Sequence, residues 1–287
     1  MKQVVWIVAL LIIIGGCSST KNPNKKPVIL VSILPQKTFV EKIAGDDFQV
    51  EVLIPHGASP ATYSLLPSQM TNISGAVMWF RIGYVGFELS WADKIIEANS
   101  KMEVVNLSEG ISLIVGSRDE KNGKPVGVDP HIWLSPVRVK KMAQKITDEL
   151  VKLNPKNYSK YQAKMLTFIK EIEETDIAIR EEMRKFAGSK FISYHPSLSY
   201  FALDYQLVQL SLEQGGKEAT VAHMADLVKT ARDENIKVIY IQSDFDKEGA
   251  QAFAGEIGGE AIQIWPLAPE WSENMLMISH ILSDNFR

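Results

Sequence analysis

Residues 155–186, PKNYSKYQAKMLTFIKEIEETDIAIREEMRKF, decide the fold class. Their apolar residues recur at spacings of three and four, which places them along one face of a single helix. Asn154 and Pro155 are typical of a helix start, and Gly188 marks the end. This helix would be about 48 Å long, which exceeds the diameter of either flanking unit. We therefore expect a long rigid helix that joins two lobes.

On both sides of this helix, short β-branched runs alternate with helical stretches. Such alternation indicates parallel βαβ units. The sequence predicts an α/β fold with two lobes, each a roughly four-stranded parallel sheet flanked by helices. The expected strands are 28–33, 48–54, 77–82 and 102–105 in the first lobe, and 191–194, 207–212, 238–242 and 261–264 in the second. A short polar loop is expected at residues 117–127.

The first sixteen residues have the features of an export signal. Lys2 precedes the apolar run 4–14, which is too short as a helix for a bilayer core of about 30 Å. Gly15 and Gly16 then precede Cys17, an arrangement that looks like a lipobox. Cys17 is therefore expected to carry a lipid that anchors the mature chain to a membrane. The alternative is an ordinary signal peptide with a chance cysteine.

The expected organisation has five parts. They are a lipoprotein signal peptide at 1–16, a lipidated flexible tether at 17–27, an N-terminal α/β lobe at 28–135, connecting helices at 136–188 and a C-terminal α/β lobe at 189–287. The tether carries almost no apolar side chain that could pack, so it would hold the folded part off the membrane.

The composition narrows the possible functions. The chain is 46% hydrophobic and 23% charged, as in ordinary globular proteins. Its 31 basic and 34 acidic residues form no long basic stripe, so no nucleic-acid partner is expected. A single cysteine excludes an internal disulfide framework and a multi-thiolate zinc site. The usual catalytic motifs, such as G-x-S-x-G and H-E-x-x-H, do not occur in the sequence, and we expect no enzyme.

Two histidines lie where ligands bind in open parallel sheets, beyond the carboxyl ends of the strands. His195 directly follows the expected strand 191–194. His131 lies in the segment 129–136, DPHIWLSP, where Asp129 could orient its imidazole. Each histidine alone could be structural, but both face the expected cleft between the lobes. They are the main candidate metal ligands.

Two further residues are weaker candidates. His56 ends the expected strand 48–54 in a Pro-His-Gly turn, which could also be a solvated corner. Asp244 follows the expected strand 238–242 and could supply an oxygen ligand. His223 and His280 fall inside amphipathic helices and are expected at the surface or in packing.

Several motifs, in order along the chain, give the sequence a family resemblance. It resembles the zinc/manganese-binding solute-binding lipoproteins of bacterial ABC importers, a group that includes adhesin-type lipoproteins. The motifs are HGASPATY at 56–63 with PSQM at 67–70, Ile82-Gly83 with Phe87-Glu88, the segment 129–136, Tyr194-His195-Pro196 with Tyr200-Phe201, Gly216-Lys217-Glu218, and Pro266-Leu267-Ala268.

The resemblance implies a metal held between two α/β lobes. Two of the family's ligand histidines fall on His131 and His195. A third is replaced by Ala61, and the family's aspartate is replaced by Trp265. Because Zn²⁺ usually takes four ligands, water, His56 or Asp244 would have to complete the shell.

The function expected from this resemblance is that of an extracytoplasmic binding protein. It would capture a divalent transition metal, Zn²⁺ with Mn²⁺ as the alternative, and deliver it to an ABC permease. It would be exported and anchored through Cys17, facing the periplasm or the cell surface. The alternative is a family member that has lost tight metal binding, with Trp265 filling the old site. Such a protein would act as an adhesin or bind another solute or protein.

Overall fold

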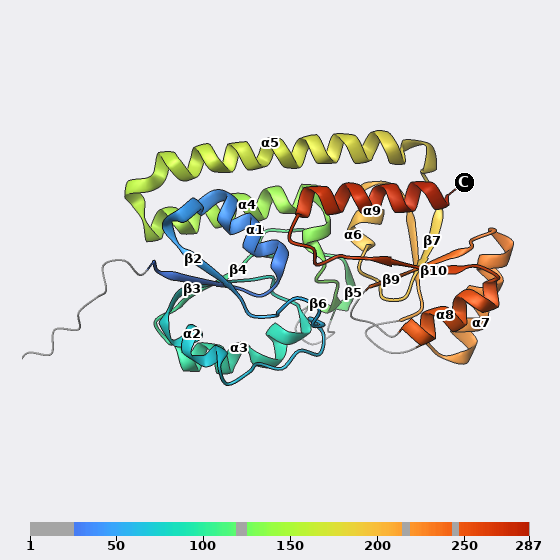
Figure 1. Cartoon of the computed structure of the whole chain (residues 1–287), viewed down its shortest axis with the longest axis horizontal. Helices are drawn as coiled ribbons and strands as arrows, with labels where there is room; N and C mark the ends of the chain where they lie inside the picture. The colour runs from blue at the N-terminus through green and yellow to red at the C-terminus, as the bar shows by residue number, and fades with distance from the viewer. Residues whose placement is uncertain (1–25, 119–124, 214–218, 243–246, 287) are drawn as a thin grey trace, which may run out of the picture.

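The computed structural model describes residues 26–118, 125–213, 219–242 and 247–286 and contains two parallel four-stranded sheets (Figure 1). The first sheet has the order β2-β1-β3-β4 and the second the order β10-β9-β7-β8. In each sheet, the strand that comes first along the chain lies between the next two: β1 between β2 and β3, and β7 between β8 and β9. The predicted fold class is confirmed. The strands are β1 (Val28–Val31), β2 (Gln49–Val52), β3 (Ala76–Arg81), β4 (Glu103–Asn106), β7 (Lys190–Ser193), β8 (Val208–Ser211), β9 (Val238–Gln242) and β10 (Glu260–Ile264).

Helices flank both sheets, as the alternating pattern predicts. Those of the first half are α1 (Leu34–Ala44), α2 (Gln69–Gly75) and α3 (Gly86–Ala98), with a 3₁₀ turn η1 (Gly45–Asp47) after α1. Those of the second half are α6 (Ser199–Asp204), α7 (Val221–Asp233), α8 (Lys247–Ile257) and α9 (Trp271–Asn285).

Two helices connect the halves. α4 (Pro136–Leu153) begins at Ser135, whose hydroxyl accepts a hydrogen bond from the backbone N–H of Arg138 at 3.3 Å. α5 (Tyr158–Met183) lies between the 3₁₀ turns η3 (Pro155–Asn157) and η4 (Arg184–Phe186), so helical structure covers the whole predicted stretch. Figure 1 shows α5 running above both sheets, which confirms the long helix between two lobes.

The long helix packs on three neighbours, α4, α1 and α9. Its buried face includes Tyr161, Met165, Phe168 and Ile172, the residues that carry the helical spacing. The ring centroid of Phe39 in α1 lies 5.6 Å from that of Phe168 and 5.8 Å from that of Trp271 at the start of α9. The C-terminal helix thus shares one apolar core with the first helix of the chain.

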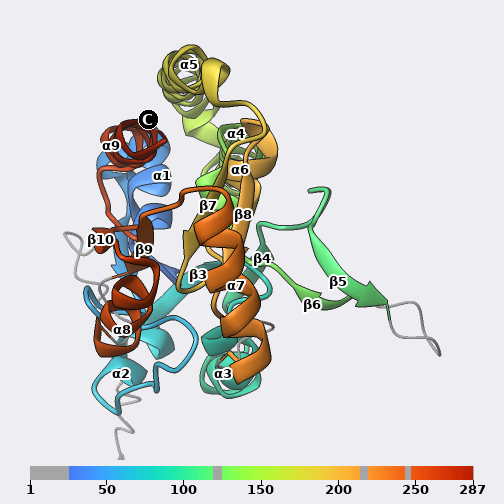
Figure 2. The ribbon, with the colours of Figure 1, turned by 90° about the vertical axis from the view of Figure 1, so that its right-hand side faces the viewer.

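The prediction of a polar loop at 117–127 is wrong at both ends of that range, where the chain forms strands. Two short strands, β5 (Val115–Arg118) and β6 (Pro125–Val128), form an antiparallel hairpin that projects from the rest of the molecule (Figure 2). Each strand has only four residues and each includes a glycine, so the periodicity is too short to detect. The tip of the hairpin lies outside the described residues.

The predicted signal peptide and Cys17 also lie outside the described residues. Within the part of the chain that the structure describes, no helix is both long enough and apolar enough to cross a bilayer.

Glu88 in α3 is a buried carboxyl that fixes the turn after β3. It accepts hydrogen bonds from the backbone N–H groups of Ile82 (2.7 Å) and Gly83 (2.5 Å) and from the hydroxyl of Ser32. Burial raises the pKa of Glu88, while these hydrogen bonds act in the opposite direction. Gly83 has a φ of +115°, and a Cβ there would lie 2.4 Å from Asn106 Oδ1, so the turn requires glycine.

The substitution Glu88→Ala tests this turn. It would leave two backbone N–H groups in the interior without an acceptor, so we expect a loss of about 2–4 kcal/mol in the free energy of unfolding. Urea denaturation measures the loss. Glu97→Ala, on the exposed side of the same helix, is the control and should change stability by less than about 0.5 kcal/mol. Equal effects of the two substitutions would contradict this role.

Candidate metal-binding site

A cavity of about 410 Å³ lies between the two lobes and contains both main candidate ligands. Its residues come from the loops after β2, β3 and β10, the hairpin β5–β6, the segment before α4 and the carboxyl ends of β7 and β9. In the second sheet, β7 and β9 lie on either side of the point where the strand order reverses, which is where open α/β sheets bind ligands. The expected position of the site between the lobes agrees with this cavity.

His131 is held by its neighbour Asp129. The carboxylate oxygen Oδ1 accepts hydrogen bonds from the backbone N–H of His131 at 2.9 Å and from its ring Nδ1 at 2.8 Å. Burial alone would raise the pKa of Asp129, but the charge and hydrogen bonds of His131 outweigh it and lower that pKa. Because the ionised carboxylate holds Nδ1–H, the nitrogen of the neutral ring that could bind a metal is Nε2.

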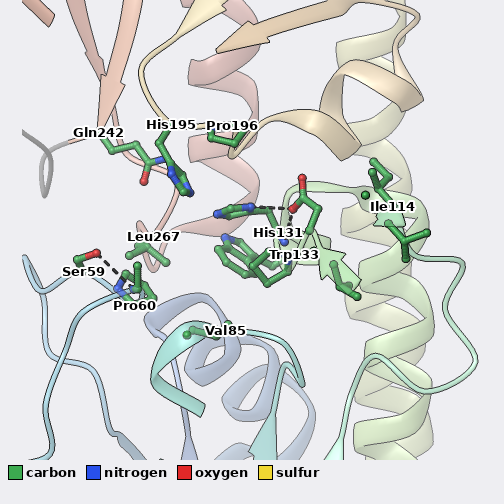
Figure 3. Close-up of a pocket in the computed structure, with 18 residues that line it drawn as sticks. Ser59, Pro60, Val85, Ile114, His131, Trp133, His195, Pro196, Gln242 and Leu267 are labelled. Carbon is green, nitrogen blue, oxygen red and sulfur yellow. Dashed lines mark hydrogen bonds and ion pairs between the residues drawn. The ribbon is translucent and has the colours of Figure 1, made fainter. Parts of the chain in front are cut away.

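His195 has the same arrangement in the second lobe. Its Nδ1 donates to Oε2 of Glu213, which follows β8, at 2.6 Å. The rings of His131 and His195 face each other in the cavity, with centroids 5.2 Å apart and planes at 72° (Figure 3). Two imidazoles bound through Nε2 to one tetrahedral Zn²⁺ at about 2.0–2.1 Å would have centroids roughly 5 Å apart. The two rings therefore fit a shared metal ion.

The segment that carries His131 is tied to the second lobe. The hydroxyl of Tyr200 in α6 donates to the backbone oxygen of Asp129 at 2.9 Å and accepts from the backbone N–H of Ile114 at 3.0 Å. Burial raises the pKa of Tyr200 to about 12, so this hydroxyl stays neutral and can donate. Arg138 lies over the Tyr200 ring, 4.3 Å from its centroid.

A second tie uses two buried indoles. Trp133, in the 3₁₀ turn η2 (Ile132–Leu134), donates from Nε1 to the backbone oxygen of Pro266 at 2.8 Å. Trp271 in turn donates from its Nε1 to the backbone oxygen of Trp133 at 2.6 Å. Since both indoles are only 2% exposed, their N–H groups depend on these acceptors.

The structure also brings Gln242 into the cavity. Gln242 is the last residue of β9, and β9 pairs with β7 so that Ser193 is opposite Tyr240. His195 and Gln242 each lie two residues after this pair, so they come to the same edge of the sheet. Both line the cavity (Figure 3). Sequence reasoning missed Gln242 and Glu213. Strand pairing in the second sheet is the signal that would find them, because Gln242 ends β9, Glu213 follows β8, and both strands pair with β7.

The structure does not bring His56 into this cavity. His56 follows β2, an edge strand of the first sheet, and its turn lines a neighbouring cavity together with residues 265–270. Trp265 lines that second cavity too, and its side chain is 40% exposed. The expectation that Trp265 fills the old metal site is therefore wrong. Ala61, at the position where the resemblance places a histidine, does line the main cavity. Asp244 lies outside the described residues.

His223 and His280, expected at the surface or in packing, have local partners. His223 Nε2 lies 2.8 Å from the backbone oxygen of Ser211, and His280 Nδ1 lies 2.7 Å from Glu182 Oε1. The His280 side chain is 74% exposed.

The donor set of the main cavity is small. Its two imidazoles suit Zn²⁺ and other borderline-soft divalent metals. Among the described residues, no group of three or more His, Cys, Asp or Glu side chains is placed to hold a metal. A metal held by the two imidazoles would therefore need water or a residue outside the described part to complete its coordination.

Comparison with known proteins places this geometry in a family. The chain is 28% identical over 270 residues to the high-affinity zinc uptake system protein ZnuA of Bacillus subtilis, covering 88% of this chain and 84% of that protein. It is 26% identical over 275 residues to the zinc-binding lipoprotein AdcA of Streptococcus pneumoniae, covering 91% of this chain but only 54% of AdcA. A crystal structure of ZnuA superposes with a TM-score of 0.84 at 35% identity, covering 92% of this chain and all of that one.

The family model described as zinc-uptake complex component A, periplasmic, matches residues 29–282. This match spans both sheets, the long helix and the cavity. The chain belongs to that family of periplasmic zinc-uptake components.

Proposed function

We propose that this chain is an extracytoplasmic solute-binding protein that captures Zn²⁺ between its lobes and delivers it to an ABC permease. The observation that carries the proposal is the pair His131 and His195, one from each side of the cavity, each oriented by a carboxylate. Their ring separation of 5.2 Å suits two ligands of one tetrahedral ion. The zinc-binding relatives and the family match support the same function.

The metal is the cargo, and its identity follows from the donors. Neutral imidazole nitrogens favour Zn²⁺ over Mn²⁺, which prefers carboxylate and water oxygens. Mn²⁺ is the alternative cargo. We propose His131 and His195 as ligands, and Asp244 remains a candidate oxygen ligand. His56 could join only if its turn moved out of the neighbouring cavity.

The proposed location is outside the cytoplasmic membrane. We propose cleavage before Cys17 and lipidation of its thiol, with residues 18–27 as the tether. The proposed domain limits remain 28–135 and 189–287 for the lobes, with 136–188 between them. The protein would act as a carrier and not as an enzyme, in line with the solute-binding role of its family.

Substitution of the two histidines tests the site. We expect the metal-free chain to bind one Zn²⁺, and His131→Ala or His195→Ala to weaken binding by about 100-fold or more, because each removes a direct nitrogen ligand. Isothermal titration calorimetry with a competing chelator measures the affinity. His280→Ala removes an exposed histidine and should leave the affinity unchanged. Full affinity in the double variant of His131 and His195 would show that the site is elsewhere.

Substitution of the orienting carboxylates should weaken Zn²⁺ binding less than substitution of the histidines does. Asp129→Asn and Glu213→Gln keep the size of each side chain but remove the charge that holds Nδ1–H, so Zn²⁺ affinity should fall by about 10–100-fold. The folded structure should persist, as circular dichroism would show. Glu234→Gln, which changes a carboxylate paired with Lys190, is the control. An unchanged affinity in both orienting variants would mean that the carboxylates do not support the ligands.

A further inference from the structure

The first lobe carries almost no charge around the cavity. Residues 52–92 include only two charged residues, Arg81 and Glu88, where the chain average of 23% would give about nine. The side chain of Arg81 is 19% exposed and that of Glu88 is fully buried. Two other residues of this stretch, Gly86 and the exposed Ala61, line the cavity. The rim of the cavity on this lobe is therefore uncharged.

Large apolar side chains protrude from this uncharged surface. Leu66 is 53% exposed and Leu89 is 65% exposed. The loop that carries Leu66 is held by Gln69, whose Oε1 accepts hydrogen bonds from the backbone N–H of Leu66 and from the hydroxyl of Tyr63, both at 2.9 Å. The Tyr63 ring packs on Phe87, in the first turn of α3, with centroids 5.7 Å apart. Leu66 and Leu89 are thus presented by one fixed unit of loop and helix.

The second lobe has a similar patch beside the site. Val221 is 88% exposed and Met224 is 38% exposed, and both belong to the first four residues of α7. Residues 219–225 include no charged residue. His223, between the two apolar residues, has its Nε2 2.8 Å from the backbone oxygen of Ser211. Because Ser211 ends β8, close to the carboxylate that orients the imidazole of the second lobe, the patch lies next to the metal site.

The two patches flank the cavity from both lobes. Figures 1 and 2 show α3 and α7 on the same side of the molecule, away from α5. We call Leu66, Leu89, Val221 and Met224 the rim residues. Exposed apolar side chains that gather around a functional opening are typical of protein–protein contacts.

The position and chemistry of the rim indicate which partner covers it. Zn²⁺ must pass the rim to enter and to leave, and exposed carboxylates there would bind the cation on its way. An uncharged rim offers no such ligands, and apolar contacts around it would exclude water from the path of the metal. A second copy of this chain on the rim would instead close the cavity and block both loading and release. The partner is therefore the protein that receives the metal.

We propose that the rim residues form the docking surface for the extracytoplasmic face of the ABC permease, and that the permease meets them with uncharged, apolar loops. The inference rests on the proposed function, because it names the surface through which the metal is delivered. The hydrogen bonds of Gln69 and His223 hold both patches in place before docking. Little entropy is then lost when the loops bind.

The test uses proteoliposomes that contain the permease and the ATPase of this uptake system, with the zinc-loaded protein added outside. Zinc uptake and ATP hydrolysis are measured against protein concentration. Leu89→Glu and Val221→Glu each place a charge in one patch. Each should raise the half-maximal concentration by about tenfold or more, because the charge must lose its water on docking. Both positions lie in the first turn of a helix, where an acidic side chain is favourable, so the fold should persist.

Matched controls lie on the opposite side of the molecule. Leu166→Glu and Ile177→Glu make the same change on α5, at side chains that are 61% and 58% exposed. They should leave the half-maximal concentration unchanged. None of the four substituted residues lines the cavity, so all four variants should bind Zn²⁺ with the affinity of the unmodified protein in calorimetry.

Three outcomes would overturn this inference, and they separate it from the proposed function. If the unmodified protein binds no Zn²⁺ or drives no uptake, the proposed function fails and this inference fails with it. If it drives uptake and the rim variants behave like the α5 variants, the proposed function stands and this inference alone fails. If analytical ultracentrifugation shows a dimer that Leu89→Glu and Val221→Glu dissociate, a second copy covers the rim and this inference alone fails.

Discussion

Two indole hydrogen bonds hold the two sides of the cavity together. Trp133 donates to the backbone of Pro266, and Trp271 donates to the backbone of Trp133, so the segment before α4 and the segment before α9 are bonded in both directions. Both bonds are buried, and separating the segments would leave N–H and C=O groups unpaired in the core. His131 lies two residues before Trp133 and is positioned by this connection.

The same connection continues into the helical layer. Trp271 packs edge-on against Phe39 of α1, and Phe39 contacts Phe168 of the long helix. The wall of the cavity and the helix that spans both lobes thus belong to one apolar core. A close-packed core does not deform continuously, so the position of His131 relative to the second sheet is set by the fold. A metal ion need not impose it.

Much of the fold could be predicted from the sequence because its signals are local. Short strands of four to six residues alternate with helices, and the buried face of the long helix is mostly apolar. His131 and His195 could be placed at the ends of their elements for the same reason. Gln242 and Glu213 could not, because they join the site through the pairing of β7 with β9 and β8, and the paired residues lie 18 or 47 positions apart along the chain. The position of Trp265 depended on packing that periodicity does not encode.

Diffraction from crystals of the zinc-loaded chain, with data collected on both sides of the zinc absorption edge, tests the proposed zinc site most directly. We expect one anomalous peak in the main cavity, bonded to Nε2 of His131 and Nε2 of His195 at about 2.0–2.1 Å. A principal peak outside this cavity, or a zinc ion bound by only one of the two imidazoles, would contradict it.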